Sequence, residues 1–153
     1  MAAGPFIVST VHSQWAKAEA KLRKAAEHEA LRGVRKAISK ETLTARKRIR
    51  SAALEKLPHK GGLNKWAAVL PTALTRQTAD GFSVRIRMQR GKHDFKDLDR
   101  GQIRHPVFGN RKTWVNETVN GGFFTREIEA LKPELEHAVS EAFRKYAEEF
   151  NRP

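Results

Sequence analysis

The stretch from Ser13 to Leu57 contains no proline and only one glycine, Gly33. Its apolar residues recur every fourth position, with one step of seven, at Leu22, Ala26, Ala30, Val34, Ile38, Ala45, Ile49, Ala53 and Leu57. This spacing places them in one stripe along an α-helix. We therefore expect a long basic N-terminal helix over residues 13–57. It should stop before Pro58, because proline cannot continue a helix.

A continuous helix of this length would reach about 65 Å, which is too long for a compact domain of this size. We therefore expect the helix either to project and pack on neighbouring molecules, or to break near Gly33 or around Ser39–Glu41. The apolar stripe is rich in alanine and buries little area per residue. A thin stripe on a long helix favours a partner that completes its burial.

The rest of the chain has strand patterns followed by a second helix. Asp80-Gly81 predicts a turn, and residues 82–88 alternate apolar and polar as a strand does. Residues 66–70 and 72–78 are also expected to be extended, 91–112 to form a long loop or an open hairpin, and 113–119 a short strand. Thr125 is a suitable N-cap for an amphipathic helix over 125–150. Pro133 then implies a kink or a later start.

The predicted architecture is thus an α+β fold in a single domain spanning residues 1–153. Its parts are a flexible arm (1–12), the long N-terminal helix (13–57), a small antiparallel β-sheet with a long loop (63–119) and the C-terminal amphipathic helix (125–150).

The formal charge of +13 is divided unevenly along the chain. Residues 1–60 carry +9 and residues 61–126 carry +7, whereas residues 127–153 carry −3. Such an excess favours an acidic macromolecular partner, either nucleic acid or the acidic face of a protein. The basic first part and the acidic last helix could pair within one molecule or between neighbouring copies in a ring.

Several classes of function lack their signatures. The chain has no cysteine and no apolar run near the ~20 residues of a membrane span, and its first eleven residues have no basic leader. Phosphate-binding loops, nucleophile elbows and zinc-protease motifs are also missing. We expect a soluble protein, made inside the cell, with no enzymatic activity, cofactor or metal.

Two arrangements nevertheless merit weighing as metal sites. His93, Asp94, Asp97 and Asp99 could form a carboxylate site, although a solvated acidic turn is the favoured interpretation. Arg104-His105 followed by Asn110 superficially resembles a histidine-centred nuclease finger, but Glu117, the only acid nearby downstream, lies in the predicted strand rather than in a turn before a helix.

Two basic clusters suggest contact with phosphates. Candidate DNA-facing residues on the expected long helix are Arg46, Lys47, Arg48 and Arg50, and those on and after the expected strand are Arg85, Arg87 and Arg90. Rows of this kind make salt-sensitive contacts with duplex DNA that do not depend on its sequence.

The richest segment is the candidate protein-docking loop, which comprises Arg104, His105, Pro106, Val107, Phe108, Gly109, Asn110 and Arg111, with Trp114 close behind. Pro106 and Gly109 impose a particular backbone path. Four bulky aromatic residues fall in or near it: Phe108, Trp114, Phe123 and Phe124. We expect Trp114 and Phe124 to pack beneath the C-terminal helix and Phe108 to be an exposed anchor.

The order of these motifs resembles a known family. The motifs are Leu57-Pro58, Gly61-Gly62-Leu63, the segment from Arg104 to Arg111, Trp114-Val115 and Gly122-Phe123-Phe124-Thr125. Over roughly residues 15–150 the chain resembles the tail-completion or head–tail joining proteins of long-tailed bacteriophages, in the version of actinobacterial phages and prophages. That version often has a proline before the glycine of the G-F-F segment, where this chain has Asn120-Gly121-Gly122.

The resemblance implies a small α+β neck subunit without catalytic residues, located in the virion and made in the cytoplasm of the host bacterium. Its partners would be copies of itself in a ring, six-fold by the resemblance, a head-side connector or stopper, and a tail-side terminator or tube protein. Genomic DNA would pass through the ring, and no membrane is involved. The alternative is a stand-alone basic protein that binds DNA without sequence preference.

Overall fold

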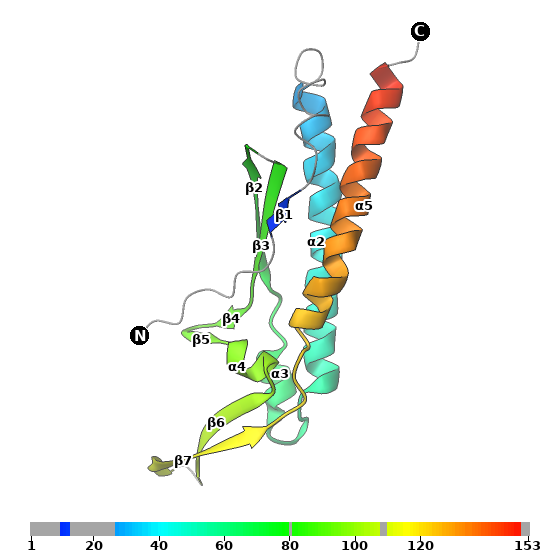
Figure 1. The fold of residues 1–153 in the computed structure, drawn as a ribbon. Coiled ribbons are helices and arrows are strands. Elements are labelled where there is room, and N and C mark those ends of the chain that lie inside the picture. Colours follow the sequence, from blue (N-terminus) through cyan, green and yellow to red (C-terminus); the bar gives the residue numbers. More distant parts are fainter. Residues whose placement is uncertain (1–9, 13–26, 80, 108–109, 151–153) are drawn as a thin grey trace. The chain divides into compact units, whose positions relative to one another are not determined.

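The computed structural model describes residues 10–12, 27–79, 81–107 and 110–150, and Figure 1 shows its elements. In chain order these are β1 (Thr10–His12), α2 (Glu27–Lys56), the 3-10 turn η1 (Lys60–Gly62), α3 (Leu63–Ala67), β2 (Thr72–Thr78), β3 (Gly81–Arg87), β4 (Gln89–Arg90), β5 (His93–Asp94), α4 (Lys96–Asp99), β6 (Gln102–Val107), β7 (Asn110–Thr118) and α5 (Thr125–Phe150). Long helices thus accompany small β-sheets, which confirms the predicted α+β class.

Contacts within the chain divide it into two compact units, where a single domain was expected. Of the described residues, the first unit holds 46–72 and 87–127. The second unit holds 10–12, 27–45, 73–86 and 128–150. The two long helices, α2 and α5, contribute residues to both units.

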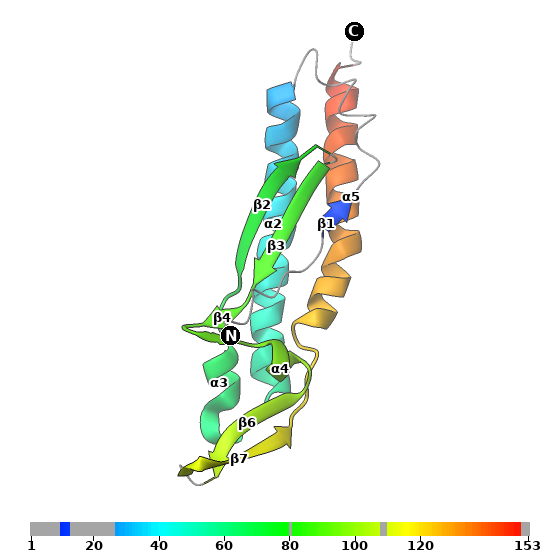
Figure 2. The ribbon, with the colours of Figure 1, turned by 60° about the vertical axis from the view of Figure 1, so that its left-hand side comes forward.

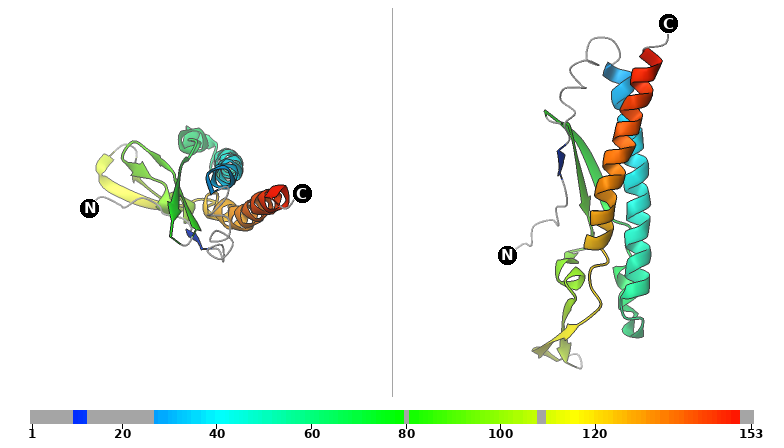
Figure 3. Two further views of the ribbon diagram at one scale, coloured as in Figure 1. Left: turned by 90° about the horizontal axis from the view of Figure 1, so that it is seen from above. Right: turned by 45° about the vertical axis from the view of Figure 1, so that its right-hand side comes forward.

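Helix α2 is continuous through Gly33 and through Ser39–Glu41, which excludes the second of the two alternatives, a break at these residues. A β-carbon at position 33 would lie 2.3 Å from Tyr146 Oη. Gly33 therefore leaves room for an aromatic ring of α5, which lies beside α2 in the second unit (Figure 1 and Figure 3). The end of α2 at Lys56 agrees with the stop expected before Pro58, whereas residues 13–26 of the expected helix lie outside the described residues.

The second unit contains a three-stranded sheet with β3 between β1 and β2 (Figure 2). Residues Thr10 and His12, from the end of the expected arm, pair antiparallel with Ser83 and Gly81 of β3. Along β3 the exposure alternates as predicted, with Arg85 exposed between buried neighbours. The buried apolar residues of this unit are Ala30, Val34, Ile38, Ala45, Phe82, Val84, Ile86, Ile128, Leu131, Leu135 and Val139.

In the first unit, the segment expected to be extended from Trp66 begins instead in the helical turn α3. Gly61 and Gly62 have φ angles of 80° and 76°, which lets the chain reverse after Pro58. Asn64 Nδ2 then donates to the Leu54 carbonyl at 3.1 Å. The Trp66 ring packs edge-on against Phe95, with centroids 5.2 Å apart. This unit buries Ile49, Ala52, Ala53, Leu57, Ala67, Met88, Phe95, Leu98, Phe123 and Phe124.

Helix α5 begins at Thr125, as predicted, and continues through Pro133, so the later start is wrong. The region expected as a long loop or open hairpin, residues 91–112, holds β5, the turn of helix α4, strand β6 and the start of β7, and β5 pairs with β4 just before the region.

Candidate protein-docking hairpin

Strands β6 and β7 form an antiparallel hairpin that contains most of the predicted docking loop. Arg104 is opposite Asn116, His105 opposite Val115, and Pro106 opposite Trp114. The register then shifts, so that Val107 is opposite Asn110. The expected anchor Phe108, with Gly109, lies outside the described residues.

Both faces of strand β7 are open to solvent, whereas β6 also has half-buried residues: Ile103, His105, Pro106 and Val107. Every residue of β7 is exposed. Neighbouring residues of a strand point to opposite faces, and the neighbours Trp114 and Val115 are 46% and 37% exposed. The expectation that Trp114 packs beneath the C-terminal helix is therefore wrong, because the hairpin places its ring outside the core. Phe124, by contrast, is buried as expected.

The exposed Trp114 side chain is held in place by neighbours within the hairpin. Its Nε1–H donates to the Arg111 carbonyl at 2.9 Å. The Arg104 guanidinium lies 5.5 Å from the centroid of the indole ring, in a cation–π contact. A large apolar surface is thus fixed in one orientation while much of it remains accessible.

The opposite face carries an ion pair between His105 and Glu117, with Nε2 and Oε1 3.1 Å apart. The hydrogen bond with Glu117, and secondly that with the Pro106 carbonyl, raises the pKa of His105 above its ordinary value. Near the turn, the Lys112 N–H donates to Asn110 Oδ1 at 3.0 Å. Polar side chains of the hairpin therefore satisfy one another across and along its strands.

The base of the hairpin is tied to the start of α5 through Asp99. The Phe124 N–H and the Thr125 N–H donate to its two carboxylate oxygens at 2.6 and 3.2 Å, and the Thr125 hydroxyl donates as well. Asp99 is only 7% exposed, so the favoured interpretation of a solvated acidic turn is wrong for this residue. A negative charge at this position also complements the positive end of the helix dipole.

Backbone contacts close the same junction. The Val119 N–H donates to the Gly101 carbonyl at 2.8 Å, and the Gly122 N–H to the Asp99 carbonyl at 2.6 Å. A β-carbon at Gly121 would lie 2.5 Å from the Asp99 carbonyl oxygen. Only glycine fits at position 121, which explains why the Asn120-Gly121-Gly122 segment has glycine there.

Within the parts of the chain that the structure describes, no three His, Cys, Asp or Glu side chains gather as a metal site would require. In the same parts, no helix is long and apolar enough to cross a membrane.

Three of the seven candidate DNA-facing cations are engaged inside the first unit. Arg46 donates to the Pro71 carbonyl, Arg48 Nε lies 3.0 Å from Glu127 Oε2, and Arg90 Nη1 donates to the Trp66 carbonyl at 2.7 Å. Arg46 and Arg48 are half-buried, whereas Arg90 stays exposed. The other four are also exposed: Lys47 and Arg50 on α2, and Arg85 and Arg87 on β3. The helix cluster is therefore smaller than the sequence suggested.

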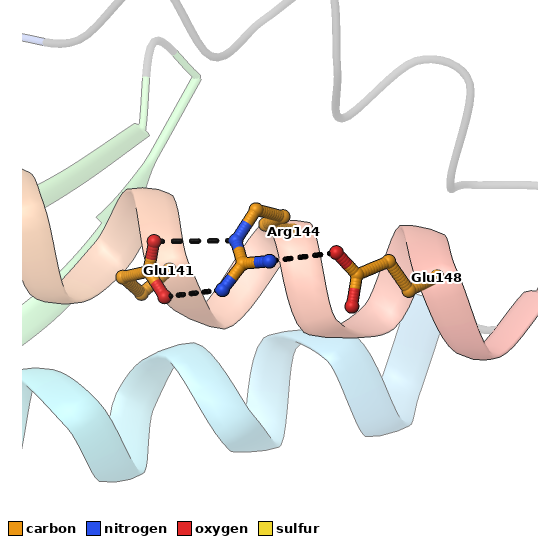
Figure 4. Close-up of polar contacts among 3 residues, drawn as sticks. All are labelled: Glu141, Arg144 and Glu148. Carbon is orange, nitrogen blue, oxygen red and sulfur yellow. Dashed lines mark hydrogen bonds and ion pairs between the residues drawn. The ribbon is translucent and has the colours of Figure 1, made fainter.

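Acidic residues of the last helix also find partners within the chain. Arg144 bridges Glu141 and Glu148 on α5, with contacts of 2.8 and 2.7 Å (Figure 4). Its hydrogen bond and charge lower the pKa of Glu141. These contacts lie within α5 itself, whereas the pair between Arg48 and Glu127 matches a cation of the basic first part with a carboxylate of the last helix within one molecule.

The comparisons with protein families, curated proteins and solved structures found no match.

Proposed function

We propose that this chain is a structural subunit of the head–tail interface of a long-tailed bacteriophage, as its resemblance to tail-completion proteins implies. Its copies would form a ring, six-fold by that resemblance, around the path of the genomic DNA. The ring would lie in the virion neck between a head-side connector or stopper and a tail-side terminator or tube protein. In this proposal the role is structural, with no catalytic step.

The observation that carries the proposal is the exposed β6–β7 hairpin with its fixed Trp114. A two-stranded hairpin is marginally stable by itself in water, so one whose strand β7 exposes both faces gains from a partner. Tryptophan and arginine dominate the binding energy of many interfaces, and here Arg104 already contacts the Trp114 ring. A side chain ordered before binding also loses less entropy when the complex forms.

The test is a complementation experiment in which Trp114→Ala replaces the wild-type chain during phage growth. We expect the variant to fold, because Trp114 is 46% exposed, but to leave heads and tails unjoined in electron micrographs. Leu74→Ala is the matched control, because Leu74 is 45% exposed on β2 and belongs to the second unit, whereas the hairpin belongs to the first. Phe108→Ala extends the test to the residue that the sequence selected as the anchor.

Normal joining of heads and tails by Trp114→Ala would contradict the docking role of the hairpin. Equal loss of joining with Leu74→Ala would show that the defect is not specific to the hairpin.

The second candidate, a stand-alone DNA-binding protein, is supported by four exposed cations outside the contacts described above: Lys47, Arg50, Arg85 and Arg87. It predicts duplex binding that weakens steeply with salt, and a loss of affinity when these four are replaced by glutamine. Arg46, Arg48 and Arg90 are unsuitable for this test, because replacing them would disturb internal contacts. An absence of duplex binding at low salt would remove this candidate.

A further inference from the structure

Strand β2 is an uncovered edge of the sheet in the second unit. The strand order is β1-β3-β2, so one side of β2 faces β3 and its other side faces no described strand (Figure 2). Every residue of β2 is exposed, Leu74 to 45%. Among the described residues, no backbone group outside the sheet forms a hydrogen bond with the backbone of β2. Residues 73–78, which carry the inference, all belong to the second unit.

The sequence of β2 does little to protect this edge. Natural proteins block exposed edge strands with proline, lysine or bulges. Residues 73–78 contain neither proline nor lysine, and their only charge is Arg76. An edge of this kind accepts another strand through main-chain hydrogen bonds. A helix cannot fill it, because its main-chain groups already bond to one another, which excludes helix α5 of a second copy as the occupant.

The residues of β2 are suited to pair with the same strand of a second copy. When two identical strands pair antiparallel about a two-fold axis, one residue lies opposite its own copy. With Thr75 at this position, Leu74 lies opposite Arg76 and Ala73 opposite Gln77 of the second copy. No like charges then lie opposite each other. Two threonines form a favourable cross-strand pair, and the aliphatic stem of the arginine packs on the leucine.

The neighbouring registers are less favourable. A pair centred on Arg76 would set two guanidinium groups directly opposite each other, which is repulsive. A pair centred on Leu74 would bring Pro71 into the ladder, where proline has no N–H to donate. Only the register centred on Thr75 pairs the whole strand with itself.

We propose that two copies of the free chain pair antiparallel through the outer edges of their β2 strands, with Thr75 opposite Thr75. A contact between two single strands is small, so the pair is weak and reversible. Such a two-fold pair is closed, whereas neighbours in a ring contact one another through two different surfaces. The pairing therefore belongs to the chain before it enters a ring, and it goes beyond the proposed function.

The test is sedimentation velocity of the full chain at about 0.15 M salt, where charges farther apart than about 8 Å are largely screened. Thr75→Lys sets lysine against lysine in the pair, whereas in a single chain the position is exposed. Thr113→Lys is the matched control, because it makes the same substitution at an exposed position of β7, in the first unit. Thr75→Glu is the rescue variant, because it offers the lysine variant an opposite charge.

We expect the wild type and Thr113→Lys to form dimers as their concentration rises, and Thr75→Lys to dimerise about tenfold more weakly. An equimolar mixture of Thr75→Lys and Thr75→Glu should associate more strongly than either variant alone. Circular dichroism checks that the variants keep their secondary structure, as exposed positions allow.

A wild-type chain that stays monomeric up to about 0.5 mM would overturn the proposal, because the edge would then await a strand of a different protein. Equal weakening by Thr75→Lys and Thr113→Lys, or no rescue in the mixture, would also overturn it. The control of the joining experiment, Leu74→Ala, keeps the main chain that forms the pair, so the two experiments can fail independently.

Discussion

Replacing Asp99 by alanine removes the carboxylate that receives three hydrogen bonds at the start of α5. The donors are the Phe124 N–H, the Thr125 N–H and the Thr125 hydroxyl. Loss of a helix N-cap costs about 0.5–2 kcal/mol. Loss of a charged acceptor for a buried donor costs about 1–3 kcal/mol, and Phe124 is only 2% exposed. These effects overlap, so we expect the variant to lose about 2–4 kcal/mol of unfolding free energy.

The assay is urea unfolding followed by circular dichroism. Asp99→Asn should lose less than Asp99→Ala, because its amide oxygen still accepts the Phe124 N–H while its NH₂ group cannot accept from Thr125. Asp97→Ala is the control. Asp97 lies two residues away in the same helical turn. Its side chain is exposed, and its Oδ1 lies 3.9 Å from Arg100 Nη1. Such a surface pair contributes about 0–1 kcal/mol.

The reasoning is refuted if Asp99→Ala and Asp97→Ala cost the same. That result would show that Asp99 does not hold the start of α5.

Two further predictions concern the helix pair and the hairpin. Gly33→Ala should lower the unfolding free energy by about 1–3 kcal/mol, because its β-carbon would lie 2.3 Å from Tyr146 Oη. In a chain that already carries Tyr146→Ala, the same substitution should instead raise the unfolding free energy in urea melts, because alanine is ordinarily preferred over glycine in a helix. An unchanged cost in that background would contradict the close contact. His105 should titrate above its ordinary pKa of 6.5 in the wild type and return toward it in Glu117→Gln, as followed by NMR. Folding raises the pKa of His105, so its ion pair with Glu117 stabilises the hairpin fully at pH values below the pKa of histidine in the unfolded chain. This stabilisation is lost as the pH rises through the pKa of His105 in the folded chain. An identical titration curve in Glu117→Gln would exclude this pair as the cause.

Local patterns were sufficient for the parts of the fold that depend on nearby residues. Proline and periodicity predicted the end of α2 before Pro58. Alternation predicted β3, and Thr125 marked the first residue of α5. These features depend on backbone sterics and on one buried face, both of which are legible along the chain.

Long-range contacts explain what the sequence could not predict. Asp99 was interpreted as part of an acidic turn because its hydrogen-bond donors, the backbone N–H groups of Phe124 and Thr125, lie 25 and 26 residues further along the chain. Gly33 suggested a break because the Tyr146 ring that it accommodates belongs to the other long helix. Trp114 was expected in the core because size alone does not reveal that both faces of its strand β7 are exposed.

The basic residues give the same lesson. The first cluster was expected to face DNA as a unit, yet Arg46 and Arg48 contact groups of their own unit while Lys47 and Arg50 face solvent. Consecutive helical residues point in different directions, so a charged run in the sequence is divided between faces.

The central claim is that this chain joins head and tail, with the hairpin as a docking element. An electron cryomicroscopy reconstruction of the intact phage particle tests it most directly. We predict a ring of this chain between the head connector and the tail tube, with residues 102–118 against another protein and Trp114 in the contact. A purified, infectious particle that lacks this chain, or a ring whose hairpins all face solvent, would contradict it.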